Sequence, residues 1–203
     1  MKTSPVVIIC PGNGCSDIRN SNWYGRLFNE LQDRDIGCVC ENFPDPLHAR
    51  RDRWVPHVRS LAEKSGCPEN IVLVGHSSGA QAALRYAELY PVHACILVSA
   101  TYSDLGDAHE RASGYYPQKQ IQQQAGDDSD KEIETNPYDF SKMKINCKTW
   151  HQFHSDDDPF IPVHEAQAVQ RGLDLDDTFY LLRNRSHFFD FQQEILDSVL
   201  SVC

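Results

Sequence analysis

The chain has 203 residues, of which 40% are hydrophobic and 24% charged, and its formal net charge at pH 7 is -10. That length suits one domain with a sizeable core, so we predict a single domain over residues 1–203. The acidic balance disfavours nucleic acid and anionic membrane surfaces as partners, because both repel a negatively charged protein. No apolar run in the sequence reaches the length of a membrane span.

The N-terminus and the cysteines indicate the compartment. The first apolar stretch, residues 6–10, is short and passes into Pro11-Gly12 without a cleavage-site pattern, so we expect no signal peptide. The eight cysteines show no C-x-x-C spacing, and several lie in apolar runs, as small core residues do. The sequence therefore predicts a reducing compartment, the cytoplasm, and leaves the nucleus open.

Apolar strand-like runs alternate with amphipathic helical patterns along the chain. The predicted strands are 6–10, 37–43, 71–74, 94–99, 149–154 and 178–182. The predicted helices lie near 22–33, 49–64, 79–90, 163–172 and 190–201. This alternation predicts a three-layer α/β fold, in which helices cover both faces of a mostly parallel sheet of about six strands. Functional residues are then expected at the carboxyl ends of the strands.

One segment differs from the rest in composition. Residues 117–136 read PQKQIQQQAGDDSDKEIETN, which is rich in Gln and acidic residues and poor in apolar ones. Such a segment buries little surface, so we expect a mobile, linker-like excursion. Two interpretations stay open, a tolerated surface insertion and part of a lid over the site.

The most specific motif is G-x-S-x-G, which directly follows the apolar run 71–74. This context is typical of a nucleophile elbow, the tight strand-to-helix turn that exposes a catalytic serine. The turn requires Gly75 and Gly79 to lack a Cβ. It would raise the Ser77 hydroxyl above the sheet edge and leave the Ser78 amide at a helix N-terminus, where it can donate to an oxyanion.

A serine nucleophile needs a base, and the base needs a carboxylate to orient it. In hydrolases built on this elbow the chain order is serine, acid, histidine. Three aspartates, residues 156–158, follow the predicted strand 149–154. His187 alone among the nine histidines follows the last strand and precedes the final helix. Pro159 and Pro162 fix the turn around Asp158, so we favour it as the acid and expect Asp156 and Asp157 to stay solvated.

Two other patterns suggest metal or phosphate binding. His151 and His154 lie three residues apart on a predicted strand and so point to opposite faces, which does not make a metal site. Gly12-Asn13-Gly14 lacks the rest of a phosphate loop. A glycine-rich turn after an early strand instead suits the second oxyanion amide, from Asn13 or Gly14. No cofactor is implied.

Several motifs together resemble the retinoblastoma-binding protein 9 family of serine hydrolases, within the α/β-hydrolase superfamily. They are Pro11-Gly12-Asn13-Gly14, Trp23-Tyr24-Gly25, Pro44-Asp45-Pro46, Gly75-His76-Ser77-Ser78-Gly79-Ala80, Arg85-Tyr86-Ala87-Glu88 and Asp157-Asp158-Pro159-Phe160, among others. The similarity covers nearly the whole chain. It implies a compact α/β-hydrolase fold with the triad Ser77, Asp158 and His187.

The chain departs from that family in three places. Ser186 stands where the family has a glycine before the catalytic histidine, and the insert 117–136 is longer than the family's connection. The family's Leu-x-Cys-x-Glu motif corresponds here to Ser65-Gly66-Cys67-Pro68-Glu69, which lacks the leucine. We therefore do not expect retinoblastoma-protein binding.

Together these features predict a serine hydrolase that cleaves an ester, thioester or amide of a small substrate through an acyl-enzyme. The alternative from another class is a protein-interaction module on a hydrolase scaffold with little or no catalysis. That all three triad positions are filled argues against this alternative.

Overall fold

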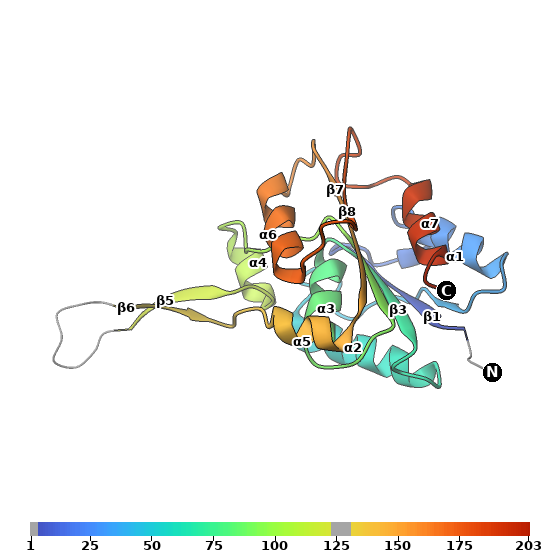
Figure 1. The fold of residues 1–203 in the computed structure, drawn as a ribbon, viewed down its shortest axis with the longest axis horizontal. Coiled ribbons are helices and arrows are strands. Elements are labelled where there is room, and N and C mark those ends of the chain that lie inside the picture. The colour runs from blue at the N-terminus through green and yellow to red at the C-terminus, as the bar shows by residue number, and fades with distance from the viewer. Residues whose placement is uncertain (1–3, 123–130) are drawn as a thin grey trace.

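A computed structural model describes residues 4–122 and 131–203. At its centre lies a six-stranded sheet in the order β2-β1-β3-β4-β7-β8 (Figure 1). Every neighbouring pair in this sheet is parallel. The strands are β1 (Val6–Cys10), β2 (Cys38–Val39), β3 (Ile71–His76), β4 (Ala94–Val98), β7 (Thr149–Ser155) and β8 (Phe179–Leu182).

Helices cover both faces of the sheet, which confirms the predicted α/β fold (Figure 1). One face packs against α1 (Tyr24–Gln32) and α7 (Gln193–Leu200). The other packs against α2 (Arg51–Lys64), α3 (Ser78–Ala87), α5 (Phe140–Asn146) and α6 (Val163–Leu173). The short elements η1 (Ile18–Asn20) and α4 (Ala108–Ser113) lie in the connections.

Strand β1 shows why the central strands are continuous apolar runs. Val7 and Ile9 belong to the hydrophobic cluster beneath α1 and α7, whereas Ile8 and Cys10 belong to the cluster beneath α2 and α3. All four side chains are fully buried. A parallel strand covered on both faces needs apolar residues at every position rather than in alternation.

The excursion at 117–136 contains regular structure where the chain is described. Strands β5 (Gln118–Gln122) and β6 (Lys131–Thr135) pair antiparallel, with Gln118 opposite Thr135. The linker-like interpretation is therefore wrong for these residues, because the two backbones satisfy each other's hydrogen bonds. Residues 123–130 of the predicted excursion lie outside the described residues. The hairpin extends away from the rest of the molecule (Figure 1).

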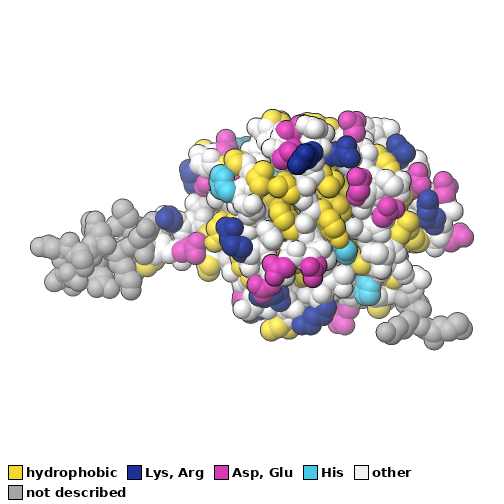
Figure 2. Space-filling view, turned by 45° about the horizontal axis from the view of Figure 1, so that its top comes forward, with side chains coloured by type: hydrophobic (Ala, Val, Ile, Leu, Met, Phe, Trp, Pro, Cys, Tyr) yellow, Lys and Arg dark blue, Asp and Glu magenta, His cyan; other side chains and the backbone are white. Residues whose placement is uncertain are grey.

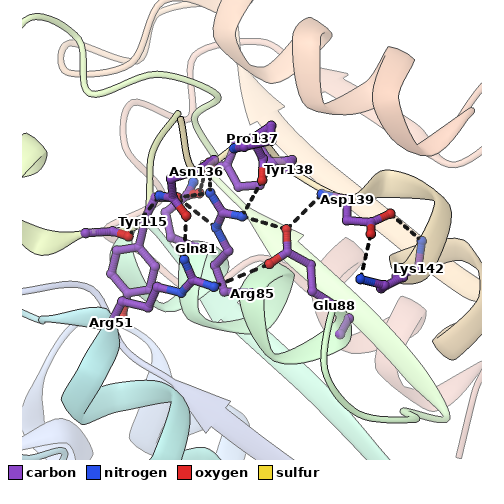
Figure 3. Close-up of polar contacts among 12 residues, drawn as sticks. Arg51, Gln81, Arg85, Glu88, Tyr115, Asn136, Pro137, Tyr138, Asp139 and Lys142 are labelled. Atoms are coloured by element: carbon purple, nitrogen blue, oxygen red, sulfur yellow. Dashed lines mark hydrogen bonds and ion pairs between the residues drawn. The ribbon is translucent and has the colours of Figure 1, made fainter. Parts of the chain in front are cut away.

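A buried guanidinium ties the base of this hairpin to α3 (Figure 3). The side chain of Arg85 is 1% exposed and pairs with Glu88 at 2.6 Å. It also donates to the carbonyls of Tyr115, Asn136 and Pro137. A buried charge is tolerated only when it is paired and hydrogen-bonded in this way. The hairpin base is thus fixed to the helix that begins directly after Ser77.

Candidate active site

Ser77 occupies a strained turn between β3 and α3, with φ 54° and ψ -120°. The turn depends on its glycines. A Cβ on Gly75 would lie 2.5 Å from the carbonyl oxygen of Gly79, and a Cβ on Gly79 would collide with the carbonyls of Cys10 and Pro11. Backbone strain of this kind persists where the surrounding structure enforces it, as at active sites. The expected steric requirement of the elbow is therefore present.

His187 and Asp158 meet at the carboxyl ends of the strands. His187 Nδ1 lies 2.8 Å from Asp158 Oδ2, and the Asp158 side chain is fully buried. Asp158 Oδ1 accepts from the amides of Phe160 and Ile161 at 3.0 and 3.1 Å. Burial by itself raises the pKa of Asp158, but the hydrogen bond and charge of His187, with these two amides, outweigh it and hold the pKa below its usual value.

Ser77 and His187 open onto one cavity of about 370 Å³. Phe160 and Phe189 stand at its rim, 59% and 46% exposed, and the Phe160 ring lies edge-on to the His187 imidazole at 5.0 Å. Figure 2 shows hydrophobic side chains gathered on the face toward the viewer, with acidic and basic side chains around them. The lining residues are Gly12, Asn13, Asn22, His76, Ser77, Ser78, Thr101, Leu105, Glu110, Tyr116, Phe160, Ile161, His187 and Phe189.

The two candidates for the second oxyanion amide differ in their hydrogen bonds. The Gly14 amide donates to the Pro46 carbonyl at 2.7 Å, which occupies it in holding the turn. Asn13 lines the cavity beside Ser78, the first residue of α3. Within residues 4–122 and 131–203, no hydrogen bond engages the Asn13 amide. Asn13 is therefore the candidate donor, and Gly14 supports the turn.

The other two aspartates hold the loop that carries His187. Asp156 Oδ1 accepts from the Asn184 amide at 3.0 Å. Asp157 Oδ1 accepts from the Ser155 hydroxyl at 2.6 Å and from the Ser186 amide at 2.8 Å, and these bonds lower the pKa of Asp157. Both aspartates are exposed, as expected, and each one also accepts from a backbone amide of this loop, a role that the sequence did not predict.

Two polar residues near the site were not identified from the sequence. Ser99, directly after β4, donates its hydroxyl to Asp158 Oδ2 at 3.0 Å. Glu165 accepts from the Thr101 hydroxyl at 2.9 Å and from the Ser103 amide at 2.7 Å, which holds a loop beside the cavity. Ser99 could have been found from its place at the carboxyl end of a strand. Glu165 could not, because it lies on α6 and reaches the loop only in the folded chain.

The two histidines of β7 make separate contacts. His154 is buried and donates from Nε2 to the Ile161 carbonyl at 3.0 Å, whereas His151 stacks on Tyr180. Across the described part of the chain, no three His, Cys, Asp or Glu side chains gather as metal ligands. Nor does any helix in those residues have the length and apolar character needed to cross a membrane.

Comparisons with known proteins show the family of the chain. Residues 7–190 match the model of the family described as alpha/beta hydrolase family. The chain is 39% identical over 189 residues to the serine hydrolase RBBP9 of Rattus norvegicus. This alignment covers 93% of the present chain and 89% of the rat protein.

Solved structures share the fold. The ydeN gene product of B. subtilis has a TM-score of 0.76 at 23% identity, covering 98% of both chains. The monoacylglycerol lipase of Paleococcus ferrophilus has a TM-score of 0.65 at 17% identity, covering 98% of this chain and 94% of that one. The chain therefore belongs to the alpha/beta hydrolase family, and it is a serine hydrolase.

Proposed function

We propose that this serine hydrolase acts through the triad Ser77, His187 and Asp158 and cleaves an ester, thioester or amide of a small substrate. The observation that carries the proposal is the buried 2.8 Å contact between His187 Nδ1 and Asp158, on the same cavity as the strained Ser77. A carboxylate at that nitrogen keeps a hydrogen on Nδ1 and leaves Nε2 free to accept the serine proton.

The chemistry follows from these positions. Ser77 Oγ attacks the acyl carbon while His187 Nε2 takes its proton, and the carbonyl oxygen becomes an oxyanion. The amides of Ser78 and Asn13 stabilise this oxyanion. The tetrahedral adduct collapses as His187 returns the proton to the leaving group, which gives the acyl-enzyme. Water then repeats the sequence and releases the acid.

The cavity favours a compact substrate with an apolar portion. Its volume of about 370 Å³ lies near the lower end of the range for small-molecule sites. Leu105, Phe160 and Phe189 supply apolar surface at the mouth, and each is more than a third exposed. Burying an acyl chain against these side chains gives binding energy without a specific polar contact.

Turnover of a chemically graded panel tests the proposal. Straight-chain p-nitrophenyl esters of increasing length, matched thioesters and aminoacyl amides are offered to the wild type, to Ser77→Ala and to Ser60→Ala, a control on α2. We expect turnover by the wild type and the control only. Loss of activity in the Ser60→Ala control, or full activity in Ser77→Ala, would contradict the proposal. A wild type that turns over none of these substrates would contradict the proposed substrate class.

We further propose that the protein works in the cytoplasm on small molecules, without nucleic-acid, membrane or retinoblastoma-protein partners. All eight cysteines are free thiols, which fits a reducing compartment. The net charge of -10 supports the first two exclusions. Fractionation of cells that express a tagged chain tests the compartment, and recovery in the secretory pathway would contradict it.

A further inference from the structure

A chain of buried hydrogen bonds joins the oxyanion turn to the loop that carries His187. The Gly12 amide donates to the Tyr24 hydroxyl oxygen at 2.9 Å. That hydroxyl lies 2.6 Å from His76 Nδ1, and His76 Nε2 lies 2.9 Å from the His187 carbonyl oxygen. Tyr24 is fully buried and His76 is 1% exposed. These hydrogen bonds therefore connect the turn at Gly12 to the loop at His187 through His76, the residue next to Ser77.

The partners fix the direction of each bond. A carbonyl oxygen only accepts, so His76 Nε2 carries the hydrogen that is donated to His187. Burial, and next the nearby His187, lower the pKa of His76 to about 3, so the ring is neutral near pH 7. His76 Nδ1 is then an acceptor, and the Tyr24 hydroxyl donates to it. The Tyr24 oxygen in turn accepts from the Gly12 amide and from Asn22 Nδ2, the latter at 3.1 Å. Each ring nitrogen of His76 has one role, so the neutral ring has a single tautomer here.

The loop at the far end of these hydrogen bonds depends on outside support. Ser186 and Phe188, on either side of His187, have φ values of 50° and 52°, which non-glycine residues rarely adopt. Two consecutive carbonyls of this loop accept hydrogen bonds from buried side chains. The His187 carbonyl accepts from His76 Nε2, and the Phe188 carbonyl accepts from Trp23 Nε1 at 2.7 Å. The backbone around the base is thus fixed by neighbours rather than by its own preference.

We propose that Tyr24 and His76 are positioning residues that set the oxyanion turn and the His187 loop relative to each other. This inference rests on the triad proposed above. His76 directly precedes Ser77 in the elbow, so one imidazole ring links the segments that carry the nucleophile, the base and the second oxyanion amide. Neither residue exchanges a proton with substrate. They act by holding Asn13 and His187 where the tetrahedral adduct requires them.

Tyr24→Phe is the mildest test, because it removes one hydroxyl and keeps the ring packed. We expect kcat for a p-nitrophenyl ester to fall ~10–100-fold, and KM to stay within about twofold of the wild-type value. The reason is that the hydrogen bond between Tyr24 and His76 positions groups that act in the transition state rather than in substrate binding. Affinity for an alkyl boronic acid, which forms a tetrahedral adduct with serine, should fall in parallel. Tyr115→Phe is the matched control. Its hydroxyl is buried on the opposite face of the sheet and has no hydrogen-bond partner in the described residues.

A double-mutant cycle tests whether the two residues act as one unit. In His76→Gln the amide nitrogen can still donate to the His187 carbonyl, but the ring nitrogen that accepts from Tyr24 is lost, so we expect a loss comparable to that in Tyr24→Phe. Because one network is cut twice, the double variant should be no more than about threefold worse than the poorer single variant. Effects that multiply would overturn the proposal, as would a Tyr24→Phe variant with kcat within twofold of wild type. An equal loss in Tyr115→Phe would also overturn it, because that loss would reflect general packing.

The outcome separates this inference from the triad itself. Ser77→Ala is assayed beside the cycle under the same conditions. If Ser77→Ala retains turnover, the triad is wrong. If Ser77→Ala is inactive while Tyr24→Phe retains full kcat, the triad stands and only the positioning role fails.

Discussion

Replacing Asp158 with Asn changes few atoms, and the structure determines the outcome. Asp158 Oδ1 faces two amide donors, those of Phe160 and Ile161. An amide NH₂ on that side would oppose both, so the new nitrogen is forced to the Oδ2 side, toward His187 Nδ1. There it can only donate, which puts the hydrogen of His187 on Nε2. A base in that tautomer cannot accept the Ser77 proton.

The expected magnitude is large. The same change in another serine hydrolase lowers kcat by about 10⁴, which corresponds to roughly 5.5 kcal/mol of barrier. Asp157→Asn is the matched control one residue away. Its Oδ1 accepts both of the bonds found for that side chain, from Ser155 and Ser186, and an Asn carbonyl oxygen can keep both. We expect it to cost less than about tenfold, or about 1.4 kcal/mol.

Steady-state hydrolysis of one ester, with thermal unfolding to confirm the fold, compares the two variants. A crippled Asp157→Asn beside a mild Asp158→Asn would show that the carboxylate is assigned one residue out of register. Equal losses would show that the acidic loop acts as a whole.

Three further predictions concern stability. Ser186→Gly should raise the free energy of unfolding by roughly 0.5–1 kcal/mol, since φ 50° suits glycine, and a lower melting temperature would contradict this. Because the folded pKa of His76, about 3, lies below the unfolded value of 6.5, the unfolded chain binds the extra proton between them. The free energy of unfolding should therefore fall by about 1.6 kcal/mol on account of His76 as the pH drops from 6.5 to 5, and a urea midpoint that does not fall would refute it. Arg85→Leu removes the donor to the carbonyls of Tyr115, Asn136 and Pro137 and an ion-pair partner of the buried Glu88. It should cost roughly 3–5 kcal/mol by chemical denaturation, whereas a loss below about 1 kcal/mol would show that this network contributes little.

The sequence predicted the sheet and the elbow because both depend on local patterns. Buried parallel strands are apolar at every position, so β1 was predicted with the bounds it has. The steric demands at Gly75 and Gly79 are local as well. An acid and His187 each directly follow a strand, so both were expected at the carboxyl edge of the sheet. In the structure His187 and Asp158 are in contact there.

Elements that depend on tertiary contacts were missed. Helices α4 and α5 are short, with six and seven residues, and carry little periodicity. The local signals lie at their ends, the N-caps Asp107 and Asp139 and the C-cap glycine Gly114 of α4. The hairpin β5–β6 lacks apolar alternation, so its composition indicated a linker. The roles of Tyr24 and His76 arise from residues far apart in sequence, which no local pattern encodes.

Trapping of the acyl-enzyme tests the central assignment most directly. The wild type is incubated with a fluorophosphonate or a slowly hydrolysed ester, and the modified peptide is identified by mass spectrometry. We predict one adduct per chain, on Ser77, and none in a folded Ser77→Ala variant. An adduct on any other residue, or Ser77→Ala labelled at the wild-type rate, would contradict the assignment of Ser77 as the nucleophile.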